Sequence, residues 1–338
     1  MSNKDELIAQ QLEVIRAMTE RNLKNLGSDL FGGTPSPTDA PEAEEKTGKK
    51  SENETENAAE GKTAEKKENI HDLKAELETY IGLSKVKEEV KGLINLATVY
   101  AMRRDNGLPT PEMSLHLVFS GNPGTGKTMI ARFMARVYHS LGLLSKGQLV
   151  EVDRASLVAG YVGQTAQKTM KALESALGGV LFIDEAYSLT SKSENDYGME
   201  AVETILKYME DHRDDIIVII AGYSDLMQDF IDSNPGLQSR FNKYIDFADY
   251  TPEEMLDIFE LNCKKGQYEA NEAAKSALLD YFCRAALEPA DFGNARGVRN
   301  TFEKAISAQA NRIAGMADVT KDDLICLTAD DVRSAVEL

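Results

Sequence analysis

The sequence predicts an α/β fold, with a parallel β-sheet between layers of helices, followed by a small helical domain. Two observations support this prediction. Short apolar segments alternate with helical patterns between residues 115 and 247, as expected when strands are parallel and covered on both faces. After Tyr250 the pattern changes, and the remaining residues are mostly helical. We therefore expect an α/β domain over residues 70–250 and a helical domain over residues 251–338.

The residues before this α/β domain form two further parts. Residues 1–31 are predicted to form an amphipathic helix, because Ile8, Leu12 and Ile15 are four and three positions apart among polar residues. That stripe is short, so the helix could form a coiled coil, dock on a partner or fold back on the main body. Residues 32–69 contain no Val, Ile, Leu, Met, Phe, Tyr or Trp, which predicts a disordered acidic and polar linker. It is either a flexible tether for the helix or a passive tail.

The α/β domain is predicted to open with a half-buried helix, in which Val86, Val90 and Leu93 keep a four-three spacing among charged residues. Five apolar segments follow and are the expected strands, at residues 115–119, 149–152, 180–183, 216–220 and 244–247. At the start of the helical domain, Thr251 and Glu254 predict a capping box around Pro252 in the first turn. The helical domain therefore begins with a well-defined helix.

Composition excludes several classes of function. The formal net charge of -18 argues against a nucleic-acid partner, because phosphates would be repelled and no basic stripe offsets this charge. The three cysteines are widely spaced and form no metal-binding pattern, which fits a reducing compartment. The first thirty residues lack the apolar core of a signal peptide, and no later segment is apolar for long enough to span a bilayer. We expect a cytoplasmic protein with no membrane partner.

A glycine-rich motif after the first expected strand indicates the chemistry. Its sequence, GNPGTGKT, fits G-x-x-x-x-G-K-[ST] between a strand and a helix, which is the setting of a phosphate-binding loop. The motif consists of Gly121, Asn122, Pro123, Gly124, Thr125, Gly126, Lys127 and Thr128. The glycines allow successive N–H groups and the positive end of the helix dipole to converge on one spot. Lys127 would neutralise the outer phosphates of ATP, and Thr128 would offer its hydroxyl to Mg2+.

Two acidic residues extend this prediction from nucleotide binding to hydrolysis. Asp184 and Glu185 follow the continuous apolar segment at residues 180–183, at the carboxyl end of an expected central strand. Ligands of open α/β sheets bind at that edge, so these acids should face the phosphate loop. Asp184 would hold the Mg2+ shell, and Glu185 would polarise the attacking water. Alternatively, the acids simply favour the start of a helix.

Together these features resemble an AAA+ ATPase and, more narrowly, the CbxX/CfqX family, which includes stage V sporulation protein K and the red-type rubisco activases. The resemblance extends from about Leu73 to the C-terminus. It rests on six blocks in family order: LHLVFSGNPGTGKT, LLSKGQLVEVDRASLVAGYVGQTA, GGVLFIDEAYSL, IIAGYSDLM, SNPGLQSRF and FGNARGVRN. Residues before about Ile70 lie outside it. The family implies a phosphate-loop AAA+ sheet followed by a helical lid.

The resemblance assigns roles to further residues. Arg240 matches the arginine finger that reaches the nucleotide of a neighbouring subunit, and on its own it could be an ordinary surface charge. Arg296 matches the second sensor of the phosphates, with Arg299 as the reserve candidate. The adenine-pocket segment of the family matches three residues that otherwise suggest only a turn into a helix: Ile81, Gly82 and Leu83.

The same resemblance places a pore loop after the second expected strand. Tyr161, Val162 and Gly163 match the segment that lines the axial pore of a ring and grips a polypeptide; alternatively, Tyr161 packs into the core. Two positions depart from the family. Either Tyr223 or Ser224 takes the place of the asparagine at the first sensor, or that role is absent. Gln238 replaces a second arginine, which could weaken ring assembly or its dependence on nucleotide.

These features together predict a Mg2+-dependent ATPase that assembles into a homo-oligomeric ring, most simply a hexamer, and remodels an unidentified protein client as a chaperone-like motor. Glu185 and Arg240 would act in catalysis together with Lys127 and Arg296. Two alternatives stay open. One is rubisco activase-type remodelling of a single enzyme. The other is a nucleotide-gated assembly platform with little mechanical activity.

Overall fold

The structure is a computed structural model, and it describes residues 68–109, 114–161, 163–190 and 197–336. The predicted N-terminal helix, nearly all of the predicted linker and Val162 lie outside the described residues. Among the helices described, none combines the length and the apolar composition needed to cross a membrane.

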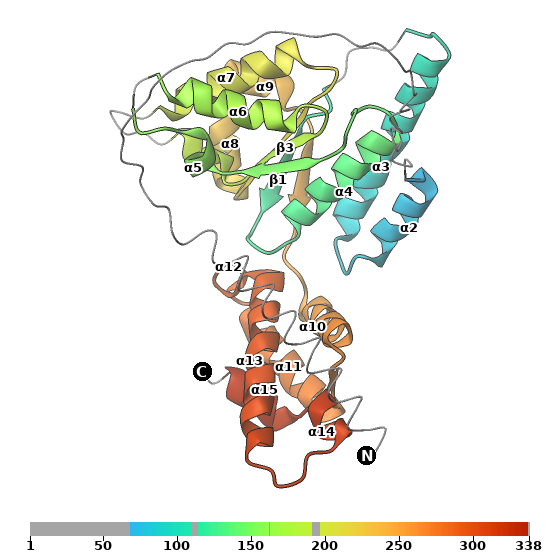
Figure 1. The fold of residues 1–338 in the computed structure, drawn as a ribbon, viewed down its shortest axis with the longest axis vertical. Helices are drawn as coiled ribbons and strands as arrows, with labels where there is room; N and C mark the ends of the chain where they lie inside the picture. Colours follow the sequence, from blue (N-terminus) through green and yellow to red (C-terminus); the bar gives the residue numbers. More distant parts are fainter. Residues whose placement is uncertain (1–67, 110–113, 162, 191–196, 337–338) are drawn as a thin grey trace, which may run out of the picture. The chain divides into compact units, whose positions relative to one another are not determined.

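A parallel sheet forms the centre of the α/β part (Figure 1), in the order β2-β3-β4-β1-β5. Its strands are β1 (Leu117–Gly121), β2 (Leu149–Val152), β3 (Val180–Ile183), β4 (Ile217–Gly222) and β5 (Tyr244–Phe247). Every neighbouring pair is parallel, with Phe119 in β1 opposite Ala221 in β4 and Ile245 in β5. The predicted parallel sheet is confirmed, and each predicted strand overlaps an observed one.

Helices cover both faces of this sheet because successive strand residues point to opposite sides. In β1, Leu117 and Phe119 join one core and Val118 joins the other. On the first face lie α2 (Ile70–Thr79), α3 (Ser84–Asp105) and α4 (Lys127–Ser140). On the second face lie α5 (Arg154–Leu157), α6 (Thr165–Ala176), the 3-10 helix η1 (Ala186–Thr190), α7 (Gly198–Asp211), α8 (Ser224–Asp232) and α9 (Pro235–Arg240). The strands between the two cores read as continuous apolar runs for this reason.

The helical lid follows β5, as predicted. It contains α10 (Pro252–Gly266), α11 (Glu272–Ala285), α12 (Pro289–Phe292), α13 (Asn294–Ala314), α14 (Lys321–Ile325) and α15 (Ala329–Val336). The predicted capping box is present, with Thr251 and Glu254 each bonding the other's backbone at the start of α10. The lid also contains a parallel strand pair that helical periodicity could not reveal, β6 (Glu269–Ala270) with β7 (Cys326–Leu327).

His116, just before β1, is a buried polar residue of the sheet. Its side chain is 8% exposed, and its Nδ1 accepts a hydrogen bond of 3.0 Å from the backbone N–H of Val218 in β4. That bond requires a neutral ring with its proton on Nε2. Burial, with the positive charges of Arg240 and Lys243 adding to it, lowers the pKa of His116 to about 4.

Stability should therefore fall with acidification in a window set by His116. The unfolded side chain takes up a proton near pH 6.5, whereas the folded one resists until about pH 4, so stability is lost as pH falls between these values. Between pH 7.5 and pH 5 this residue should remove about 2 kcal/mol of the free energy of unfolding. Urea unfolding of wild type and His116→Asn at both pH values measures the difference. An equal loss in the two proteins would contradict this explanation.

Candidate nucleotide site

The phosphate loop connects β1 to α4, and its shape depends on close backbone approaches. Gly121 adopts a φ of 139° and Gly124 a φ of 73°, which non-glycine residues rarely adopt. A Cβ on Gly121 would collide with the carbonyl oxygen of Phe247 in β5. A Cβ on Gly124 would collide with the carbonyl oxygen of Gly293 at the start of α13. The glycine at position 124 is therefore needed for the lid to dock on the loop.

Lys127 is the first residue of α4 and points back along the loop. Its Nζ donates hydrogen bonds of 2.8 Å to the carbonyl oxygens of Gly121 and Asn122. Burial lowers the pKa of Lys127, and the nearby negative charges of Asp184 and Asp249 oppose that shift. An ammonium group that is partly removed from water interacts strongly with an anion, so this position suits phosphate binding.

A pocket of about 480 Å3 lies over the loop and brings most of the predicted site residues together. Its lining includes Gly121, Pro123, Gly124, Gly126, Lys127, Thr128, Asp184, Glu185, Tyr223, Tyr250 and Arg296. The Thr128 hydroxyl and the Asp184 carboxylate are oxygen donors of the kind that Mg2+ prefers, and they share this pocket. The residues present therefore fit a metal held jointly with a phosphate ligand.

The two acids occupy this pocket because of strand order. Asp184 follows β3, which pairs with β4, and β4 pairs with β1, so the ends of all three strands meet at one edge. Glu185 has a φ of 49°, a left-handed conformation that is unfavourable for a residue with a side chain. Its backbone N–H donates to Asp184 Oδ1 at 3.1 Å. Such backbone strain persists only where the surrounding structure enforces it, as at functional sites.

Of the two first-sensor candidates, the pocket includes only Tyr223. Its ring lies 6.1 Å from that of Tyr187, which follows Glu185 closely in sequence. The Ser224 hydroxyl instead points toward Asp246 Oδ1, at 3.4 Å. Tyr223 therefore lines the pocket, and its role as first sensor stays a prediction.

Arg296 reaches the pocket from the lid, next to a cluster of hydrogen-bonded polar side chains centred on the buried Asn294. Asn294, at the start of α13, is 0% exposed and has a φ of 53°. Its Nδ2 donates to Asp249 Oδ1 at 2.8 Å, and the same carboxylate accepts from Asn122 Nδ2 at 3.0 Å. Asn122, Asp249 and Asn294, which we call the lid clasp, thus join the phosphate loop, the residues after β5 and the lid.

Backbone bonds complete the lid clasp. Asn294 Nδ2 also donates to the Pro123 carbonyl at 3.2 Å, and Asn294 Oδ1 accepts from the Tyr250 N–H at 3.0 Å. The Ala295 N–H donates to the Gly124 carbonyl at 3.2 Å. Sequence reasoning missed Asp249 and the role of Asn294, since partners 45 and 171 positions away leave no local pattern.

Arg240 lies outside this pocket, at the end of α9. Its Nη2 pairs with Glu210 Oε2 at 2.9 Å, near the C-terminal end of α7. Within one chain, therefore, the structure does not bring the predicted finger to the phosphate loop. The reserve candidate Arg299 faces solvent and pairs with Glu303 at 3.0 Å, which leaves Arg296 as the lid arginine of the site.

Of the predicted adenine segment, Ile81 to Leu83, only Leu83 lies beside the phosphate loop. The Leu83 side chain is close to Gly126, at 3.6 Å from the position that a Cβ there would take. Gly82 packs against the carboxylate of Glu254 in the capping box. Ile81 lines a different cavity, formed with α10 and β6. Tyr250, which sequence reasoning did not select, lines the pocket itself, and burial raises its pKa to about 12.

Tyr161 is the most exposed large aromatic residue described, with 73% of its surface accessible. It is therefore not a core residue. Gly163 after it has a φ of 78°, and a Cβ there would meet no atom within 4 Å. Both features fit a projecting loop, while Val162 between them is outside the described residues.

Comparisons with known proteins identify the class. The family described as "ATPase family associated with various cellular activities (AAA)" matches residues 117–249, and the AAA lid domain matches residues 251–337. This chain is thus an AAA ATPase, which binds ATP. Within that class it belongs to the family of the CbxX and CfxQ proteins, as the resemblance predicted.

Three relatives support this placement. A "Protein CfxQ homolog" of Galdieria sulphuraria is 45% identical over 255 residues, which is 75% of this chain and 83% of the relative. Stage V sporulation protein K of Bacillus subtilis is 40% identical over 265 residues, or 78% of this chain and 82% of that protein. The chloroplastic ribulose bisphosphate carboxylase/oxygenase activase of Cyanidioschyzon merolae is 44% identical over 266 residues, which is 78% of this chain and 89% of that protein.

Solved structures agree on the fold. The FIGL-1 AAA domain superposes with a TM-score of 0.52 at 19% identity, covering 79% of this chain and 88% of that one. A mutant of Thermotoga maritima RuvB gives a TM-score of 0.51 at 20% identity, covering 77% of this chain and 71% of that one. At these identities the likeness concerns the sheet and lid architecture alone.

Removing the Asn294 side chain should loosen the lid. Asn294→Ala leaves the buried Tyr250 N–H without its acceptor and removes one of the two amide groups that donate to Asp249, which should cost about 2 to 3 kcal/mol of stability. Because Arg296 would lose its fixed position, ATP affinity should fall about tenfold. Thermal unfolding and equilibrium binding of a fluorescent ATP analogue measure both effects.

Asn271→Ala is the matched control. Asn271 caps α11 in the same lid through a 2.8 Å bond from the Ala274 N–H, and it is not part of the clasp. Its loss should lower stability by about 1 kcal/mol and leave ATP affinity unchanged. Equal losses of affinity in the two variants would refute a specific role for the clasp.

Proposed function

We propose that this AAA ATPase is a Mg2+-dependent motor that forms a homo-oligomeric ring, most simply a hexamer, and remodels a protein client. The observation that supports this most directly is the single pocket shared by Lys127, Asp184, Glu185 and Arg296. Lys127 and Arg296 supply positive charge for the phosphates, and Thr128 and Asp184 supply oxygen ligands for Mg2+. Glu185 lines the same pocket and would accept a proton from the attacking water.

A composite site between subunits explains the position of Arg240. Its guanidinium is held by Glu210 on a different part of the domain from the phosphate loop. Arg240 does not line the nucleotide pocket of its own chain. In the proposed head-to-tail ring, the surface that carries Arg240 would face the nucleotide pocket of the neighbouring subunit. There it would neutralise charge on the transferring phosphoryl group, a role that fixed guanidinium groups perform well.

The exposed Tyr161 supports action on a polypeptide. A large aromatic side chain that is mostly exposed, next to glycines at positions 160 and 163, would offer a gripping surface for a polypeptide. One relative is named as an activase of ribulose bisphosphate carboxylase/oxygenase, so a single enzyme as the client is the nearest variant of this proposal. We propose a cytoplasmic location, with no nucleic acid among the partners.

Glu185→Gln tests the hydrolytic step. The amide keeps the size of the side chain but cannot accept a proton from water, so kcat should fall by about 100-fold or more while ATP affinity stays within about twofold. Steady-state phosphate release and equilibrium ATP binding provide the two readouts. Turnover at the wild-type rate would remove Glu185 from its role.

Subunit mixing tests the composite site. Arg240→Ala and Glu185→Gln subunits should each be nearly inactive alone, since each protein lacks one half of every site. Mixed rings regain interfaces that combine an intact Glu185 with an intact Arg240, and random assembly predicts about a quarter of the wild-type rate. A mixture no more active than its components, in verified mixed oligomers, would show that Arg240 acts within its own chain or not at all.

A further inference from the structure

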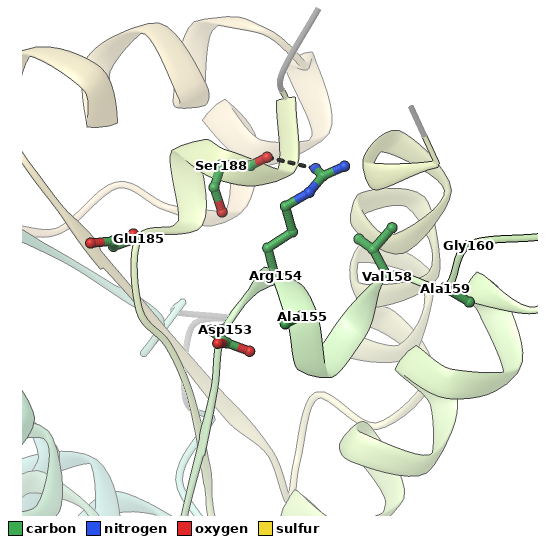
Figure 2. Close-up of a pocket in the computed structure, with 8 residues that line it drawn as sticks. All are labelled: Asp153, Arg154, Ala155, Val158, Ala159, Gly160, Glu185 and Ser188. Carbon is green, nitrogen blue, oxygen red and sulfur yellow. Dashed lines mark hydrogen bonds between the residues drawn. The ribbon is translucent and has the colours of Figure 1, made fainter. Parts of the chain in front are cut away.

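Glu185 also borders a second cavity, of about 550 Å3, that the proposed function does not use (Figure 2). The remaining lining residues come from η1 and from the segment that follows β2, and include Asp153, Arg154, Gly160 and Ser188. Gly160 directly precedes Tyr161. This cavity therefore extends from Glu185, beside the ATP site, to the base of the loop that carries Tyr161.

The side chain of Arg154 reaches across this cavity. Arg154 is the first residue of α5, and its Nη1 donates a hydrogen bond of 2.6 Å to the Ser188 carbonyl in η1 (Figure 2). The same guanidinium packs against Gly198 at the start of α7, where a Cβ would lie 2.8 Å from Nη1. A partly buried guanidinium with a short bond to a backbone carbonyl holds that carbonyl in place.

The turn that Arg154 holds is the one that begins at Glu185. The Ser188 N–H donates to the Glu185 carbonyl at 2.8 Å, so these two residues close one turn. Glu185 itself is in the left-handed conformation, with a φ of 49°, which costs about 1 to 2 kcal/mol unless neighbouring contacts enforce it. The bond from Arg154 to Ser188 is made at the other end of the same turn.

We propose that Arg154 is a positioning residue for Glu185, one that holds the strained turn so that the carboxylate points to the attacking water. This inference rests on the proposed function of Glu185. Arg154 also anchors the segment leading to Tyr161, because its own carbonyl accepts a 2.8 Å bond from the Val158 N–H. One residue thus contacts the catalytic turn through its side chain and the start of the loop through its backbone.

Substitution of Arg154 in the full-length protein tests the inference. Arg154→Met keeps the length of the side chain and removes its donors, so kcat for ATP should fall at least about tenfold, a loss typical of a misplaced catalytic group. The affinity for ATP should stay within about twofold, because Arg154 does not line the pocket over the phosphate loop. Arg154→Lys retains a charged donor and should recover part of the rate, to about two- to fivefold below wild type.

Lys168→Met is the matched control. Lys168 braces the same segment by donating to the carbonyls of Ala155 at 2.5 Å and Val158 at 3.1 Å. Among the residues described it makes no hydrogen bond to η1, so its loss should leave kcat within about twofold of wild type. Thermal unfolding verifies that each variant is folded. If Arg154→Met does not fold, Arg154→Lys decides, and its kcat should then lie about two- to fivefold below wild type with unchanged ATP affinity.

Three results would overturn the inference: wild-type kcat in the folded Arg154 variants, an equal loss in Lys168→Met, or a parallel loss of ATP affinity and kcat. Measuring Glu185→Gln in the same assay distinguishes a failure of the Arg154 inference from a failure of the proposed function. If Glu185→Gln is inactive and Arg154→Met is fully active, only the positioning role is wrong. If Glu185→Gln itself turns over normally, the function proposed for Glu185 is wrong.

Discussion

The buried amide of Asn294 makes the nucleotide pocket depend on two parts of the chain at once. Through Asp249 it is joined to Asn122 in the phosphate loop, and through its own oxygen it holds the backbone of Tyr250, where the chain leaves the sheet domain. Such groups are costly to bury without partners, so the lid and the loop are stable together in one arrangement. Arg296, two residues further along α13, takes its position in the pocket from this constraint.

On the sheet side, the order of the strands determines which residues line the same pocket. Strand order brings the ends of β1, β3 and β4 to one edge, which places Lys127 and Asp184 together without any special contact. The position of Glu185 needs additional contacts, because its backbone is in the unfavourable left-handed conformation. The turn closed by Ser188 and held by Arg154 meets that need. The acid therefore depends on a segment that also leads to Tyr161, so the pocket and the exposed loop share part of their support.

Sequence reasoning succeeded where the physics is local. The strands were predictable because residues buried on both faces form continuous apolar runs, and the start of α10 was predictable because a capping box spans only four residues. Placing Lys127 and Glu185 in one pocket followed from a general rule of parallel sheets. The role of Arg240 stays a prediction, since one chain shows its pairing with Glu210 but no neighbour.

What the sequence could not reveal depends on distant partners. Asp249 meets Asn294 and Asn122 across 45 and 127 positions, and Arg154 meets Ser188 across 34. No periodicity encodes such pairs, and an asparagine or arginine at a helix start suggests capping or solvation rather than these contacts. Ile81 shows the reverse case, because a match to a family motif suggested the nucleotide pocket, whereas the side chain lines another cavity.

Amide hydrogen exchange at Tyr250 and Ala295 tests most directly whether the lid and the phosphate loop respond to nucleotide together. These N–H groups donate to Asn294 Oδ1 and to the Gly124 carbonyl, so each exchanges only when the lid separates from the loop. Binding of a nonhydrolysable ATP analogue, held by both parts, should slow exchange at both positions by a similar factor, and Asn294→Ala should abolish the effect. Unchanged exchange at both amides on saturation with nucleotide would contradict the coupling.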